Sequence, residues 1–433
     1  MRLWTLLALG ALPVFAHAQP AQIDTALASL YFSEIETAGA GDAGRLWGRR
    51  VDGPMFFVGA SSGIVVANAP DREGLLSQNG KVWTGRLPQS IVPANTATTL
   101  GGRRYSMLMW PVPDNRYSRT RLLMHESFHR IQDSLGLPMA NPSNVHMSTL
   151  SGRMWTRLEW RALTEALLRD GEARRRALAD ALAIRARRHL LSARAAEEER
   201  QLELNEGLAE YTGLVLNGLP RSALADRVAL QLAQHEQQES FVRSFAYATG
   251  PAYALLLDAS GSQWRQRLSS STSLPALAAK TYGIVMATAD SATLVARYGA
   301  RRMVAEERSR EARRITAEAD MRAQFIDGPS LTLPVGSKFS FSFDPTGVKI
   351  LPGTGAVYES SRITDEWGSL DVTSGGVLML RDAAGLITGV VVAKPVIAGE
   401  NLSGDGWKLT LARGWRAQEV AGKAGSYRLA PAD

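Results

Sequence analysis

Hydrophobic residues change their spacing along the chain, and each change predicts a different kind of structure. Residues 21 to 38 carry apolar positions three or four residues apart, which is typical of a short helix. Between about 46 and 110, short apolar runs such as 55 to 58 and 105 to 110 are bounded by Gly, Pro, Asn or Asp. Such runs predict strands joined by turns.

From about residue 119 to 325 the pattern is mainly helical. The first expected helix covers 119 to 135 and is closed by Gly136 and Pro138. Further helices are expected at about 201 to 217, 222 to 258 and 290 to 322.

Residues 153 to about 200 form a long, charged insertion within this helical region, with a break at Asp170-Gly171. This pattern predicts a helical hairpin. Its apolar stripe is narrow, so we expect its two helices to pack mainly on each other. Such a hairpin would serve as a lid, a substrate gate or a docking arm.

After residue 328 the spacing becomes that of short strands separated by Gly, Asp and Pro turns, which predicts a β-sandwich or barrel over 328 to 433. The expected fold class is therefore α+β, with an N-terminal α+β segment at 19 to 118 and a mainly helical domain at 119 to 325. The expected C-terminal strands lie at 331 to 333, 339 to 343, 377 to 380, 387 to 392 and 407 to 411.

The first 18 residues have the features of a secretory signal peptide. One basic residue, Arg2, precedes an apolar run that ends before the small-x-small site Ala16-His17-Ala18. That run is too short to span a bilayer, and no later run of about 18 apolar residues follows. We therefore expect a secreted or periplasmic protein without a transmembrane segment.

Composition narrows the chemistry. The 433 residues include no cysteine, which excludes disulfides, thiolate nucleophiles and zinc held by cysteine. The formal charge is +7, but basic and acidic residues are interleaved as on solvated helix faces. We expect no nucleic-acid partner.

Residues 125 to 129 read His-Glu-Ser-Phe-His, within a stretch free of helix breakers. On a helix, His125 and His129 lie one turn apart on the same face, so both imidazoles can reach one metal ion. Glu126 lies between them, where it can take a proton from a water on the metal.

A third ligand is suggested further along the chain. Residues 204 to 211 read L-N-E-G-L-A-E-Y, which resembles the N-E-G-x-A-x-Y signature that follows H-E-x-x-H in gluzincin metallopeptidases of the aminopeptidase N type. The resemblance implies a zincin-like fold in which Glu206 is the third zinc ligand. It also implies that Glu210 bonds the non-ligating nitrogen of a zinc histidine; the alternative is that Glu210 is the ligand and Glu206 the helper.

Residues 247 to 252 read Y-A-T-G-P-A, similar to the Y-x-x-G segment of the same family. In that family the tyrosine stabilises the oxyanion, which implies this role for Tyr247. The alternative is that Tyr247 packs in a helix core with Phe241 and Phe245, and that Tyr211 or Tyr253 replaces it.

The resemblance covers roughly residues 100 to 260, and two departures limit it. His129 and Glu206 are separated by 76 residues (206 − 129 − 1), a far longer connection than in the family. The G-x-M-E-N motif that binds a substrate amino terminus is missing, so aminopeptidase specificity does not transfer. We expect the strand at 105 to 110 to be an edge strand able to pair with substrate.

These observations predict an exported zinc-dependent metallopeptidase with one zinc ion per chain, in which a zinc-activated water attacks the peptide bond and Glu126 is the general base. Its partner would be a peptide or protein substrate. Two alternatives remain open at this point: a non-catalytic envelope binding protein on a zincin scaffold, and a zinc hydrolase that acts on a non-peptide bond.

Overall fold

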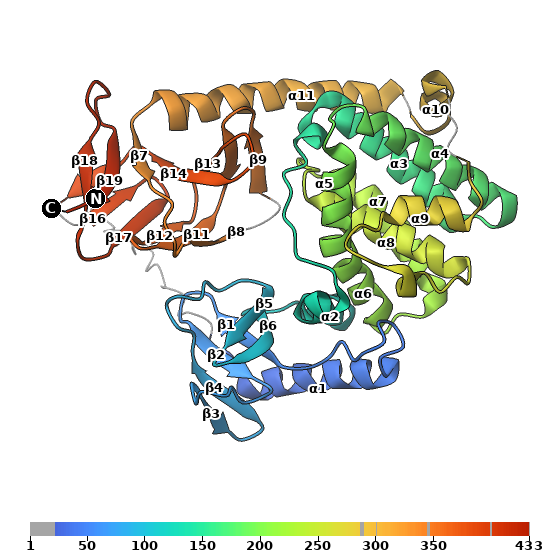
Figure 1. The fold of residues 1–433 in the computed structure, drawn as a ribbon, viewed down its shortest axis with the longest axis horizontal. Helices are drawn as coiled ribbons and strands as arrows, with labels where there is room; N and C mark the ends of the chain where they lie inside the picture. The colour runs from blue at the N-terminus through green and yellow to red at the C-terminus, as the bar shows by residue number, and fades with distance from the viewer. Residues whose placement is uncertain (1–21, 286–289, 300, 344–346, 399–400, 433) are drawn as a thin grey trace, which may run out of the picture.

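The computed structural model describes residues 22–285, 290–299, 301–343, 347–398 and 401–432. The fold is α+β, as predicted: an N-terminal six-stranded sheet, a central helical region and a C-terminal all-β region with two sheets (Figure 1). The signal peptide expected at 1 to 18 lies outside the described residues. Among those residues, no helix is both long and apolar enough to cross a bilayer.

The N-terminal part consists of one helix and one sheet. Helix α1 (Thr25–Asp42) begins at Asp24, whose carboxylate accepts hydrogen bonds from two backbone N–H groups of the first turn. Its apolar face covers the sheet, with the ring of Phe32 stacked 4.9 Å from that of Phe57. The strands are β1 (Met55–Gly59), β2 (Ile64–Ala67), β3 (Leu76–Asn79), β4 (Val82–Arg86), β5 (Thr96–Leu100) and β6 (Arg103–Trp110).

The order of this sheet is β3-β4-β2-β1-β6-β5, with β1 and β6 parallel. The expectation that the strand at 105 to 110 is an edge strand was wrong, because β6 lies between β1 and β5. The edge belongs to β5, whose sequence T-A-T-T-L lacks the apolar run by which a strand is recognised. Strand order depends on pairing between distant segments, which hydrophobic spacing does not reveal.

The helical region follows directly. Helix α2 lies between the N-terminal sheet and helix α6, which packs beside it (Figure 1). The helices are α2 (Arg116–Gln132), α3 (Leu150–Leu168), α4 (Gly171–His189), α5 (Ala195–Leu202), α6 (Leu208–Leu216), α7 (Arg221–His235), α8 (Ser244–Ala259), α9 (Leu274–Thr281), α10 (Ser291–Tyr298) and α11 (Arg301–Arg322). A π-helical turn, Glu203–Gly207, joins α5 to α6.

Helices α3 and α4 form the predicted hairpin, with the break at the predicted place. Helix α4 packs mainly on α3, as expected, but the expectation was wrong for α3, which also packs against α7, α8 and α11 and whose Trp160 is fully buried. The error arose from charged residues that appeared to form a solvated face. Arg157, for example, is buried and donates hydrogen bonds to Glu236 at 2.9 Å and Glu307 at 2.8 Å.

The C-terminal region is all-β, as predicted, and its two sheets pack face to face as a sandwich rather than closing into a barrel. Its sheets have the orders β18-β19-β7-β14-β13-β10-β9 and β15-β16-β17-β12-β11-β8, and their inner faces share one apolar core. The strands are β7 (Ser330–Leu333), β8 (Ser340–Phe343), β9 (Val348–Leu351), β10 (Gly355–Tyr358), β11 (Ser361–Asp365), β12 (Gly368–Val372), β13 (Val377–Arg381), β14 (Ile387–Ala393), β15 (Val396–Ala398), β16 (Asn401–Gly404), β17 (Trp407–Leu411), β18 (Trp415–Glu419) and β19 (Tyr427–Pro431).

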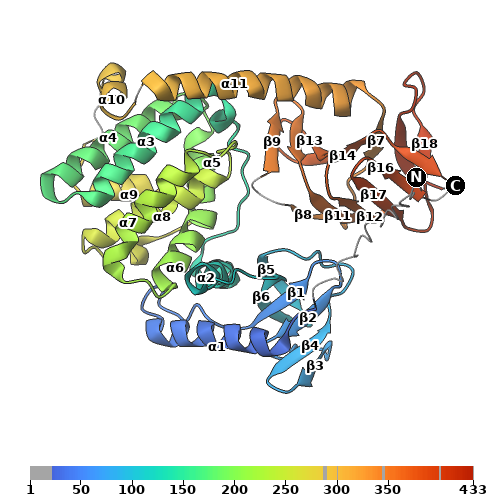
Figure 2. The same cartoon turned by 180° about the vertical axis from the view of Figure 1, so that it is seen from behind.

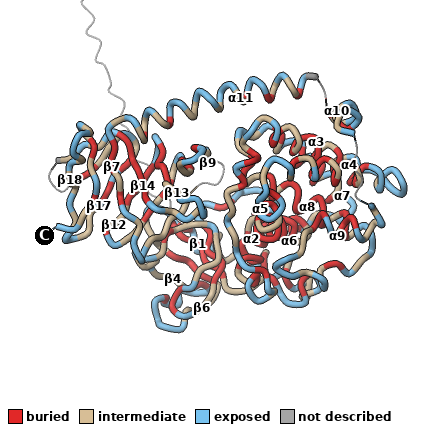
Figure 3. Tube along the Cα trace, turned by 45° about the horizontal axis from the view of Figure 1, so that its top comes forward, coloured by how far each residue is buried: buried red, intermediate tan, exposed pale blue. Residues whose placement is uncertain are grey.

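Helix α11 connects the helical region to the sandwich (Figure 2). Much of its surface is exposed (Figure 3), but Glu307 is buried and accepts hydrogen bonds from Arg153 at 2.9 Å and Arg157 at 2.8 Å. These bonds fix the first half of α11 to α3. The connection is therefore an anchored helix.

Candidate metal centre

Two histidines of α2 face the interior of the helical region. The helix begins at Asn115, whose side chain accepts a hydrogen bond from the N–H of Ser118 at 3.1 Å. His125 and His129 lie one turn apart and are both buried, with their Nε2 atoms 3.2 Å from each other. The helical register predicted from the sequence is confirmed.

The structure brings Glu206 to these histidines from the π-helical turn. Its Oε2 lies 3.4 Å from Nε2 of His125 and 3.6 Å from Nε2 of His129. The three residues are buried, and each offers one ligand atom within 4.8 Å of the others, so this cluster could hold one metal ion.

The donor atoms fit a small divalent ion. A tetrahedral ion with ligand bonds of about 2.0–2.2 Å separates its ligand atoms by roughly 3.3–3.6 Å, close to the three separations found here. Beside the cluster, Oε2 of Glu126 is buried and has no hydrogen-bond partner among the residues that the structure describes. A buried carboxylate oxygen without a partner is costly, which indicates that the site is built to receive another group.

A chain of amides supports the ligands from behind. Nδ1 of His129 lies 2.8 Å from Oε1 of Gln132, and Nε2 of Gln132 donates to Oδ1 of Asn205 at 3.0 Å. Asn205 in turn donates to Oε1 of Glu206 at 3.2 Å. Contacts of this kind fix the orientation of metal ligands. Gln132 was not predicted from the sequence, although it lies one helical turn after His129 on the same helix.

Glu210 lies on the opposite side of the His125 ring from Glu206. Its Oε2 is 3.4 Å from Nδ1 of His125, while its Oε1 accepts hydrogen bonds from Arg121 and from Gln231, the latter at 3.1 Å. It is not part of the three-residue cluster. This placement matches a carboxylate that orients a ligand histidine and disfavours the alternative in which Glu210 replaces Glu206.

Tyr247 reaches the cluster from α8. Its hydroxyl donates to Oε2 of Glu206 at 2.6 Å, and its ring stacks on that of His125 with centroids 5.5 Å apart. The two possible substitutes bond elsewhere: the hydroxyl of Tyr211 donates to Asp258 at 2.6 Å and that of Tyr253 to Glu159 at 2.6 Å. Of the three tyrosines, Tyr247 is the one whose hydroxyl bonds to a member of the cluster.

Protonation of the cluster follows from burial and contacts. Burial opposes the charged form of His125, but hydrogen bonds to Glu206 and Glu210 prevail and raise the pKa of His125 to about 10. Burial also works against ionised Glu206, yet hydrogen bonds from both histidines hold its pKa well below its usual range. A metal ion must displace the proton on His125, so metal affinity should rise with pH.

The other histidines take part in different contacts. Nε2 of His146 lies 2.8 Å from Oε1 of Glu199, and Nε2 of His189 lies 3.1 Å from Oε2 of the same carboxylate. Arg188 also pairs with Glu199, at 2.7 Å. Glu199, His146 and Arg188 are buried and His189 is half-buried, and this ion-pair network between α4 and α5 lies outside the three-residue metal cluster.

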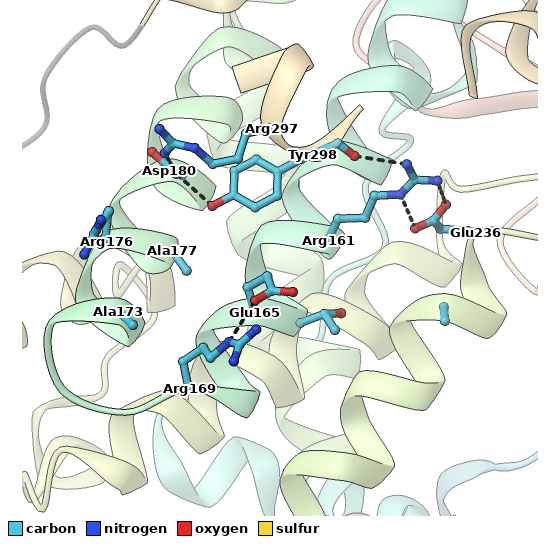
Figure 4. A pocket seen from close by; sticks show the side chains of 12 residues that line it. Arg161, Glu165, Arg169, Ala173, Arg176, Ala177, Asp180, Glu236, Arg297 and Tyr298 are labelled. Atoms are coloured by element: carbon cyan, nitrogen blue, oxygen red, sulfur yellow. Dashed lines mark hydrogen bonds and ion pairs between the residues drawn. The ribbon is translucent and has the colours of Figure 1, made fainter. Parts of the chain in front are cut away.

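A cleft of about 660 Å³ opens between the hairpin, the end of α7 and α10 (Figure 4). Its charged side chains are largely paired across the cleft, Arg161 with Glu236 and Arg297 with Asp180. None of the three cluster residues lines it. The candidate metal cluster and this cleft therefore lie in different parts of the helical region.

Comparison of the chain with protein-family models, with curated proteins and with solved structures finds no match in any of the three.

Proposed function

We propose that this protein is a zinc-dependent metallopeptidase of the gluzincin type. The observation that carries the proposal is the convergence of His125, His129 and Glu206, from elements 76 residues apart (206 − 129 − 1), on one small buried volume. Two imidazole nitrogens and one carboxylate oxygen are a ligand set that zinc prefers in catalytic sites. A zinc ion held there would polarise a carbonyl and lower the pKa of a water molecule.

Glu126 would act as the general base. It shares α2 with both histidines, and burial raises its pKa although the histidines favour its charged form. A carboxylate whose pKa approaches the working pH can take a proton from water and pass it to the leaving amine. Its Oε2, which has no partner in the described part of the chain, would accept that proton.

Tyr247 would stabilise the oxyanion that develops as water attacks the scissile carbonyl. Burial and the neighbouring Glu206 carboxylate raise the pKa of Tyr247, so the phenol remains a hydrogen-bond donor. Its hydroxyl lies 2.6 Å from the Glu206 oxygen that faces the histidines. A donor so close to the reacting atoms can contribute transition-state stabilisation.

Strand β5 gives a peptide substrate a place to lie. It forms one edge of the N-terminal sheet, pairs with β6 and packs against α2, the helix of the histidines. An extended peptide can add to such an edge through backbone hydrogen bonds. We further propose that the chain is exported, on the strength of the signal sequence before Gln19.

The test combines metal analysis with a peptide-library digest of the purified mature protein. We expect about one zinc per chain, its loss in His129→Ala, and library cleavage that Glu126→Gln reduces about a hundredfold or more at unchanged zinc content. Cleavage by Glu126→Gln at the wild-type rate would show that Glu126 is not the base. Zinc without cleavage of any peptide would favour a binding protein or a hydrolase of another bond.

A further inference from the structure

Arg243 forms a hydrogen bond with Glu206 of the candidate metal cluster and has two further N–H groups that could bind another acceptor. It lies at the start of α8, four residues before Tyr247, so both side chains reach Glu206 from one helical face. Its Nη2 donates to Oε1 of Glu206 at 3.1 Å. Its Nε and Nη1 are buried and, among the described residues, bond to nothing.

The surroundings of this guanidinium group make the two unpaired atoms significant. The side chain is 12% exposed, and the ring of Phe343 in the C-terminal sandwich lies 5.6 Å from Cζ of Arg243. Strands β8 and β9 face the helical region in Figures 1 and 2. Buried N–H groups of a charged residue are costly without acceptors, and their attraction to an anion is strong where water is excluded.

The charge balance of the centre favours an anion as the missing partner. Three carboxylates lie in and beside the cluster, on Glu126, Glu206 and Glu210, and the guanidinium groups of Arg121 and Arg243 pair with two of them. With a divalent ion bound, this set carries one net positive charge. A single carboxylate on the substrate would neutralise it.

We propose that Arg243 binds a carboxylate of the substrate next to the scissile bond, which makes peptides with a carboxylate at that place the preferred substrates. This inference rests on the proposed peptidase function. Arg243 is one hydrogen bond from Glu206, and successive residues of an extended peptide are about 3.8 Å apart. The carboxylate therefore belongs to a residue adjacent to the cleaved bond or one beyond it.

Two sources of that carboxylate share the same chemistry: the free carboxyl terminus of a peptide, and an Asp or Glu side chain. Phe343 has to move off the guanidinium group to admit either one. It is the last residue of β8, which is an edge strand of its sheet and pairs with β11. Because Phe343 covers the guanidinium group that would bind the carboxylate, the C-terminal sandwich would form one wall of the substrate site.

A different role for Arg243 would be to orient Glu206 without touching substrate. The two roles are separable, because orientation affects metal content and all peptides alike, whereas carboxylate binding affects acidic peptides selectively. Arg302 provides a matched control, since it is a highly exposed arginine on α11 that pairs with Glu306 one turn away.

The experiment measures binding of labelled peptides by fluorescence anisotropy to zinc-loaded Glu126→Gln protein, which binds without turnover. The probes are one peptide with a free carboxyl terminus, its C-terminal amide, and the amide with a glutamate next to its end. We expect at least one acidic probe to bind about tenfold or more tightly than the plain amide, because a hydrogen bond between two charged groups is stronger than one between neutral groups. Tighter binding of the peptide with a free carboxyl terminus identifies the terminus as the source of the carboxylate, and tighter binding of the glutamate-containing amide identifies a side chain.

In the Glu126→Gln background, Arg243→Gln should reduce the ratio of the affinities for the acidic probe and the plain amide to about one at unchanged zinc content. Arg302→Gln should leave this ratio unchanged. Equal binding of all three probes before Arg243 is changed overturns the proposal, whatever the variants do. So does a preference that survives in Arg243→Gln.

These measurements test the role of Arg243 separately from the proposed peptidase function. Protein with Glu126 intact that cleaves all three probes with equal kcat/KM would uphold the peptidase and refute the role of Arg243. Selective binding of the acidic probes without cleavage of any peptide would uphold carboxylate binding by Arg243 and refute the peptidase function.

Discussion

Gly207 and Gly250 hold the π-helical turn and α8 in direct backbone contact. A Cβ atom placed on Gly250 would lie 2.3 Å from Cα of Gly207, and one placed on Gly207 would lie 2.9 Å from Cα of Gly250. Neither position has room for a side chain. This close approach brings Tyr247 to Glu206, because each of these residues lies within one turn of its glycine.

Gly250→Ala should therefore damage both stability and the metal centre. Overpacking of this kind costs about 1–3 kcal/mol, and separating the helices would draw Tyr247 away from Glu206. Urea unfolding and zinc content of the same samples would measure both effects. The control is Gly41→Ala in α1, where an added Cβ meets no described atom within 4 Å, so this substitution should be neutral or slightly stabilising. Equal stability of the two variants would contradict the tight contact.

The two glutamates should differ in their effect on metal affinity. Glu206→Gln removes the carboxylate that faces both histidines, whereas Glu210→Gln changes a contact to the outer nitrogen of His125. We expect the loss of zinc affinity in Glu210→Gln to be about 10–100-fold, and that in Glu206→Gln to be larger. Competition with a zinc chelator would rank them, and the reverse order would make Glu210 the ligand.

Glu210 should also make the stability of the zinc-free protein depend on pH. Burial opposes ionisation of Glu210, but its contacts with His125 and Arg121 prevail and lower its pKa from 4.5 to about 2. Because this pKa is lower in the folded than in the unfolded protein, ionised Glu210 contributes its full share to the free energy of unfolding above about pH 4.5. This contribution is lost as the pH falls toward 2. The difference in unfolding free energy between wild type and Glu210→Gln should shrink over that range. A difference that grows on acidification would contradict the sign.

Burial of the hairpin predicts that it cannot be weakened without weakening the whole helical region. Trp160→Ala should cost about 3–5 kcal/mol, because the ring is fully buried between helices. Leu168→Ala on the same helix is the control, since Leu168 is 49% exposed. Thermal unfolding of the zinc-loaded variants would test this: a separate lid would leave the transition of the metal-binding region unchanged in both.

Local patterns in the sequence predicted much of this structure, and contacts between distant segments account for the rest. His125, Glu126 and His129 could be placed together because one helical turn relates them. Glu206 could be connected to them through a family resemblance alone, since no local rule spans the intervening residues. The contact between Arg243 and Glu206 was missed because the two residues lie on different elements, 37 positions apart (243 − 206).

The π-helical turn Glu203–Gly207 makes the centre sensitive to chain length as well as to residue type. Such a turn holds one more residue than the α-helical turn that it replaces. Glu203 is fixed by its 2.8 Å ion pair with Arg185, so deletion of Leu204 would rotate Glu206 by about 100° relative to that anchor. The letters N-E-G-L-A-E-Y would all survive, yet the carboxylate would point away from the histidines. At this place in the chain, a gain or loss of one residue would be more harmful than many substitutions.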